Sequence, residues 1–112
     1  MAIMYNSNYD ETIPFSDASV QVALATNTNA TFVVPGGPTI KYSARFSFTS
    51  TSNIFICLNS AALVPPAGTH TTQQYCEFRP ETQRYVQGGD VINMITPDAS
   101  GYVGISLRQL HG

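Results

Sequence analysis

The clearest alternation of apolar and polar residues runs through residues 40–58. Every second residue from Ile40 to Phe48 is apolar, and the residues between them are Lys, Ser or Arg. A period of two places these two sets on opposite faces of a β-strand, whereas a helix would scatter them around its circumference. The small polar residues 49–53 suit a turn, and a second apolar run follows at 54–58. The pattern therefore predicts a β-hairpin over residues 40–58, with a loop of about five residues.

The second strand of this predicted hairpin is apolar on both faces. Ile54 and Ile56 point one way, and Phe55 and Cys57 point the other. Such a strand needs cover on both faces. One face can lie on the core, and the other needs a second layer: another sheet, a chain terminus or a neighbouring subunit. Two interpretations remain open: a central strand of a two-sheet sandwich, or a strand covered by another chain.

Six further segments have strand patterns, with turns rich in Gly, Pro, Asn and Asp between them. None of them offers three turns of helical period. Gly104 inside the last one suggests a bulge or a close backbone approach. The pattern is typical of an all-β sandwich or barrel, and we expect a small antiparallel β-sandwich. The segments are 19–25, 30–34, 75–79, 85–86, 91–96 and 102–107.

Residues 1–18 have no clean period, yet large apolar residues recur among polar ones. A disordered tail would usually contain fewer of them. We expect an extended N-terminal arm, residues 1–18, that packs on something, followed by one sandwich domain, residues 19–112. A frayed chain end is the alternative. The arm residues expected to bind a partner are Ile3, Tyr5, Tyr9, Ile13 and Phe15.

Residues 59–72 form a second candidate contact. At about 14 residues this connection is long for a compact domain, and long loops are often functional or interfacial. We expect Pro65, Pro66 and His70 to contribute to partner binding there.

Composition limits the classes of function. Charged residues make up 11% of the chain, against about 25% in an average protein. The net charge of −2 and the five scattered basic residues give no footprint for nucleic acid. No stretch approaches the roughly 20 apolar residues that span a bilayer, so we expect no membrane partner. The start of the chain lacks the basic and apolar runs of a signal peptide, which predicts use without secretion.

Candidate chemistry is sparse. Cys57 and Cys76 are expected as buried free thiols, with a cross-strand bridge as the alternative. A pair of Cys76 with His70 lacks a base and an orienting group. The Cys and His residues have no metal-ligand spacing, and the acidic residues form no calcium loop. We therefore expect no enzyme, no metal and no cofactor.

The remaining charged residues have structural or surface interpretations. Asp90 follows two glycines, where a turn or capping role is natural. Glu77 and Arg79 alternate with apolar residues and should share the outer face of one strand. That face is either solvated or a charged patch on a partner-binding surface.

Carbohydrate binding is the second class of function that stays open. Small β-sandwiches often bind sugars with exposed aromatic side chains, and this chain has no Trp. The candidate tyrosines are Tyr42, Tyr75, Tyr85 and Tyr102, of which three fall in strands where a core position is more common.

Several motifs resemble those of small structural proteins of tailed bacteriophages. They are Val86-Gln87-Gly88-Gly89-Asp90-Val91-Ile92 leading to Gly104-Ile105-Ser106-Leu107, and the predicted hairpin 42–58 with the Pro-rich loop and Glu77-Phe78-Arg79-Pro80. From about residue 40 the chain is similar to the capsid decoration, or staple, proteins of epsilon15-like podoviruses. The resemblance implies a jelly-roll-like sandwich on the outside of an icosahedral shell. It also implies the major capsid protein as partner, self-association as a dimer or trimer, and synthesis in the host cytoplasm.

Two functional hypotheses follow. The first is a non-enzymatic virion protein that binds the outer capsid surface and stabilises contacts between capsid subunits, with aromatic arm residues supplying most of the binding energy. The second is a carbohydrate- or receptor-binding module of a phage tail or fibre. It would require exposed tyrosines or an acidic groove beside residues 59–72.

Overall fold

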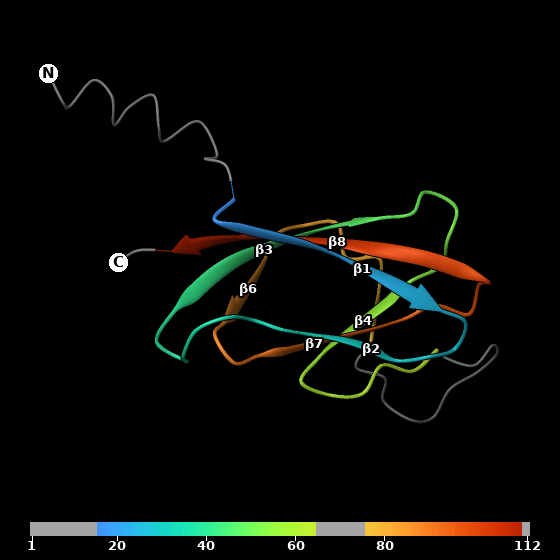
Figure 1. The fold of residues 1–112 in the computed structure, drawn as a ribbon, viewed down its shortest axis with the longest axis horizontal. Coiled ribbons are helices and arrows are strands. Elements are labelled where there is room, and N and C mark those ends of the chain that lie inside the picture. The colour runs from blue at the N-terminus through green and yellow to red at the C-terminus, as the bar shows by residue number, and fades with distance from the viewer. Residues whose placement is uncertain (1–15, 65–75, 111–112) are drawn as a thin grey trace, which may run out of the picture.

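The computed structural model describes residues 16–64 and 76–110, and these form an all-β protein (Figure 1). A strand lies in each of the eight segments with strand patterns. No helix that could span a bilayer occurs in the described ranges. The strands are β1 Ala18–Ala25, β2 Ala30–Val33, β3 Lys41–Phe48, β4 Phe55–Leu58, β5 Glu77–Phe78, β6 Arg84–Gln87, β7 Val91–Ile95 and β8 Ser100–Leu110.

The strands form two four-stranded sheets that face each other (Figure 1). The first sheet has the order β1-β8-β3-β6, and the second has the order β2-β7-β4-β5. Every pairing within the sheets is antiparallel. The expected antiparallel β-sandwich is therefore confirmed.

The predicted hairpin over residues 40–58 is wrong. Strand β3 pairs with β6 and β8, whereas β4 pairs with β5 and β7, so residues 49–53 cross from one sheet to the other. The crossing segment forms hydrogen bonds with the connection after β7 and with the first residue of β8. The Ser52 hydroxyl donates to the Ser100 carbonyl at 3.0 Å, and the Thr96 hydroxyl donates to the Asn53 carbonyl at 2.6 Å. Alternation located both strands, but it carries no information on their partners.

The pairing scheme is nested. Strand β1 pairs with β8, β2 with β7, β3 with β6 and β4 with β5. Each of the first four strands thus meets one of the last four in reverse order. All connections except the one between β4 and β5 cross between the sheets.

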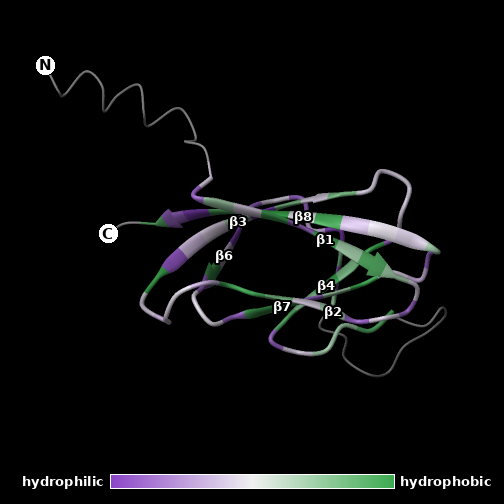
Figure 2. Cartoon of the chain, viewed as in Figure 1, coloured by the Kyte–Doolittle hydropathy of each residue, from purple (hydrophilic) through white to green (hydrophobic). Residues whose placement is uncertain are grey.

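The core lies between the sheets and follows the period of two. The first sheet contributes the buried residues Val103, Ile105 and Leu107 of β8 to this core. The second sheet contributes Ile92 and Met94 of β7. Hydrophobic residues are visible along β4 and β7 in Figure 2. Fully burying a side chain of this size contributes about 1.5–3 kcal/mol, so these alternating positions supply most of the driving force for folding.

The outer face of β4 is covered by the same chain. Cys57 is buried with Ala62 and Ile95, and Phe55, Val64 and Cys76 pack against them. Strand β4 is an internal strand of its sheet, as the first interpretation of its two apolar faces proposed. The second layer on Cys57 is a loop segment that includes Ala62 and Val64, and no other subunit is needed there.

Two glycines lie at close contacts, Gly104 against a side chain and Gly88 against backbone. A Cβ on Gly104 would lie 2.3 Å from the Ser47 Oγ, and the register of β8 runs unbroken on both sides. No bulge is present at Gly104, and its close neighbour is the Ser47 side chain and not another backbone segment. A Cβ on Gly88 would lie 2.3 Å from the Gly37 carbonyl oxygen, because the turn after β6 packs on the connection between β2 and β3. The Gly88 amide donates to the Ile40 carbonyl at 2.8 Å in the same corner.

Gly88→Ala is expected to destabilise the protein, because the new Cβ would clash with backbone that cannot rotate away. We expect the free energy of unfolding in urea to fall by about 2 kcal/mol. Gly37→Ala is the control, since a Cβ there meets nothing within 4 Å. It should change the stability by less than about 0.5 kcal/mol. Equal effects of the two substitutions would contradict the packing of this corner.

Candidate interaction surfaces

The partner-binding residues expected from the sequence lie outside the described residues. The structure therefore tests neither the arm contacts nor the loop contacts. These residues are Ile3, Tyr5, Tyr9, Ile13, Phe15, Pro65, Pro66 and His70.

The chain is held against β8 from Asp17 onward. The Asp17 amide donates to the Leu107 carbonyl at 2.8 Å, and the Gln109 amide donates to the Asp17 Oδ2 at 2.5 Å. The start of β1 is thereby fixed at one edge of the first sheet.

Strand β1 is a long sheet edge without the usual protection. Its eight residues, Ala-Ser-Val-Gln-Val-Ala-Leu-Ala, include no charge and no proline. One edge pairs with β8, and no strand in the described ranges pairs with the other. The other outer strands, β2, β5 and β6, have four, two and four residues. Natural proteins usually protect a long edge with charges, Pro or bulges, because its free backbone groups attract another strand.

An apolar groove lies beside this edge, between β1 and β2. Its volume is about 260 Å³, and no charged side chain lines it. Val33 is 58% exposed there, which is high for a branched aliphatic side chain on a strand. The lining residues are Ala18, Ser19, Val20, Phe32, Val33, Pro35, Ile105 and Leu107.

The opposite side of the sandwich is bridged by an ion pair. The Arg84 guanidinium on β6 donates to both carboxylate oxygens of Glu77 on β5, at 2.5 and 2.8 Å. The two residues belong to different sheets, so the pair joins the sheets at their outer strands. Both side chains are substantially exposed, and such a pair contributes at most about 1 kcal/mol. Its main effect is to fix the geometry of the opening.

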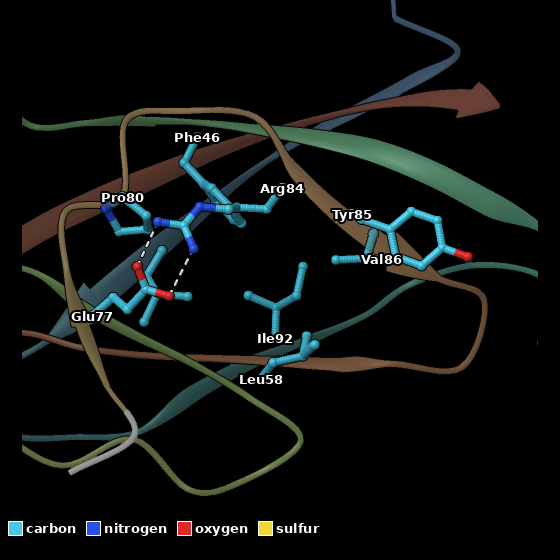
Figure 3. Close-up of a pocket in the computed structure, with 9 residues that line it drawn as sticks. Phe46, Leu58, Glu77, Pro80, Arg84, Tyr85, Val86 and Ile92 are labelled. Atoms are coloured by element: carbon cyan, nitrogen blue, oxygen red, sulfur yellow. Dashed lines mark hydrogen bonds and ion pairs between the residues drawn. The ribbon is translucent and has the colours of Figure 1, made fainter.

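A pocket of about 460 Å³ is lined at one end by this ion pair (Figure 3). Phe46, Val86 and Ile92 give it an apolar lining, and Tyr85 stands at the side away from Glu77. The Arg84 Nε is buried and has no hydrogen-bond partner among the described residues. The opening therefore combines an apolar lining, a charged pair and an aromatic ring, which are common features of small-ligand sites.

The strand tyrosines divide between core and surface. Tyr42 is buried as expected, whereas Tyr85 is 61% and Tyr102 is 38% exposed. The expectation of a core position is wrong for these two. The alternation of side chains along β6 indicates the outward position of Tyr85, because its neighbour Val86 points inward.

Arg79 does not share an outer face with Glu77, and that prediction is wrong. Strand β5 ends at Phe78, and Arg79 has a positive φ of 41°, which turns the chain. The Arg79 guanidinium donates to the carbonyls of Thr49 and Ser52, at 2.8 and 2.6 Å, and lies 5.1 Å from the Phe48 ring centre. Arg79 therefore fastens the segment that crosses between β3 and β4.

The other sequence candidates have structural roles. The Gln87 amide donates to the Asp90 Oδ2 at 2.9 Å, which confirms a turn role for Asp90. Cys57 and Cys76 are free thiols, Cys57 buried and Cys76 half-buried. Burial and the neighbouring Cys76 thiol raise the pKa of the Cys57 thiol. Within residues 16–64 and 76–110, no three His, Cys, Asp or Glu residues are grouped to hold a metal ion.

No protein-family model, curated protein or solved structure matches this chain. What its surfaces bind is therefore inferred from their own chemistry.

Arg79→Ala is expected to loosen the crossing segment, because it leaves two carbonyls without a charged donor. We expect the free energy of unfolding to fall by about 2 kcal/mol, as measured in urea. Arg45→Ala is the matched control, since Arg45 is exposed on β3. The free energy of unfolding of this control variant should lie within about 0.5 kcal/mol of that of the unmodified protein. A harmless Arg79→Ala would contradict the fastening role.

Proposed function

We propose that this protein is a non-enzymatic structural component of a tailed-phage virion. It binds the outside of an icosahedral capsid and stabilises contacts between major capsid protein subunits. The observation that carries this proposal is the uncharged edge of β1 beside an apolar groove. A free strand edge offers backbone hydrogen bonds to another chain, and the groove offers apolar contact next to it.

The nested pairing supports classing the sandwich as a jelly roll. Jelly rolls have eight strands in two sheets and occur in viral capsid proteins and lectins. The shared topology is an analogy of fold, and it does not assign a function by itself. It agrees with a virion role and equally with a sugar-binding one, so it favours neither.

The arm fits the same role. The described part of the chain begins at Ser16, and Ala18 and Ser19 of β1, close to that point, line the groove. We propose that apolar residues of the arm extend this contact over the capsid, and that the protein acts as a dimer or trimer. Many copies on one shell would make weak individual contacts effective, because each engaged contact raises the local concentration of the next.

A first experiment is to purify phage particles that carry the gene and identify this protein among their components by mass spectrometry. Its absence from intact particles would exclude the virion role. Its surface location is then checked by adding purified protein to particles made without the gene.

Val33→Lys is expected to weaken binding to such particles, because it places a charge in the apolar groove. We expect a roughly tenfold loss of affinity in a co-sedimentation assay. Thr31→Lys is the control, since Thr31 is exposed on the same strand but does not line the groove. Equal binding by the two variants would contradict the groove as the contact. Deleting residues 1–15 measures the contribution of the arm separately and leaves the Asp17 contacts in place.

A carbohydrate- or receptor-binding module is the second candidate. It is favoured by exposed Tyr85 beside the pocket, with the Glu77–Arg84 pair at the other end. An aromatic face and planar charged groups around a cleft suit a sugar ring.

In that case, purified protein is expected to bind defined sugars on a glycan array, and Tyr85→Ala is expected to remove the signal. Tyr102→Ala should keep it, because Tyr102 does not line the pocket. Absence of any glycan signal from the unmodified protein would exclude this candidate.

A further inference from the structure

The two cysteines face each other across neighbouring strands. Strands β4 and β5 pair Phe55 with Phe78 and Ile56 with Glu77. Continuing this antiparallel register by one position places Cys57 opposite Cys76. Directly opposite residues in such a pair have Cα atoms about 4.5–5.5 Å apart. This spacing lies within the range of about 4.4–6.8 Å found across disulfides.

The thiols are also in contact. Cys76 packs against the buried cluster that contains Cys57, and after burial the nearby Cys76 thiol is one of the causes that raise the pKa of the Cys57 thiol. The Leu63 amide donates to the Cys76 Sγ at 3.3 Å, which holds that sulfur in place. The pair is thus positioned for a bond with little backbone movement, although both cysteines are free.

We propose that Cys57 and Cys76 form a reversible disulfide site, whose substrate is a small soluble disulfide such as oxidised glutathione. The site clamps the segment that covers the outer face of β4. Ala62 and Val64 of that segment lie between the two cysteines in sequence and pack on the same cluster. A bond between Cys57 and Cys76 therefore closes a loop that contains Ala62 and Val64, the residues that cover β4.

The two thiols have different roles in the exchange. Cys76 is half-buried and Cys57 is buried, so Cys76 is the thiol that meets the reagent. The Cys76 thiolate attacks one sulfur of oxidised glutathione, forms a mixed disulfide and releases one glutathione thiolate. Cys57 then loses its proton, and its sulfur attacks the Cys76 sulfur and expels the second glutathione thiolate. The two protons lost by the protein end on the two glutathione molecules, so the site is oxidised as glutathione is reduced.

Closing this loop restrains the unfolded chain. A disulfide that closes a loop of about 15–20 residues raises the melting temperature of a protein of this size by roughly 10 °C. The chemistry does not depend on the proposed virion role. If the virion role is correct, the thiols would be reduced where the protein is made, and oxidised after the particle leaves the cell.

The test uses the purified full chain in buffers of increasing ratio of oxidised to reduced glutathione. Mass spectrometry should show the loss of two hydrogens, and peptide mapping should show one Cys57–Cys76 cross-link. The melting temperature should rise by roughly 10 °C and return when dithiothreitol is added. A chain that keeps two thiols, stops at a stable glutathione adduct or forms only intermolecular bonds would overturn the proposal.

Single variants test the order of attack. Cys57→Ala is expected to stop at the mixed disulfide on Cys76, because no second thiol can resolve it. Cys76→Ala is expected to react at least roughly tenfold more slowly with glutathione, because its remaining thiol is buried. Comparable adduct formation by the two variants would overturn the assignment of Cys76 as the first nucleophile. The melting temperature of each reduced variant shows whether that variant is folded. If one variant does not fold, the experiment on the unmodified protein still tests the proposed disulfide.

Discussion

The first sheet depends most on β8, the longest strand in the described ranges, which pairs along both edges. Its residues 100–107 pair with β1, and its residues 103–110 pair with β3. Its inward residues Val103, Ile105 and Leu107 are almost fully buried against the second sheet. Gly104 allows the close approach of Ser47 from β3. One strand near the end of the chain thereby orders strands from its beginning, and the nested pairing follows from this long-range contact.

The outer strands on the two sides of the sandwich differ in length and in charge. At β5 and β6 the outer strands are short, and the Glu77–Arg84 pair joins them across the opening. At β1 and β2 the described residues offer an uncharged strand and an apolar groove. The free sheet edge is thus short on one side, and on the other side the described residues leave a long edge unpaired. This asymmetry is why the β1 side is the better candidate for contact with another chain.

Apolar surface alone is a weak guide to partners in this protein. The two apolar faces of β4 are explained within one chain, because residues including Ala62 and Val64 form the layer over Cys57. The apolar surface that a partner could contact is therefore smaller than the sequence predicts. It includes exposed residues at the sides of the sandwich, such as Val33 and Tyr85. The cover over β4 also brings two thiols together. A loop that completes the fold can therefore carry a covalent site as well.

The sequence by itself determined where the strands lie and which side chains point inward, because a period of two and the turn residues are local properties. It also contained the outward position of Tyr85, through its neighbour Val86. Only the tertiary structure decided that β3 and β4 belong to different sheets, that Arg79 turns inward, and that Cys57 faces Cys76. These features arise where distant segments meet. Pairing depends on which sheet each connection crosses to, and no local pattern of residues encodes that choice.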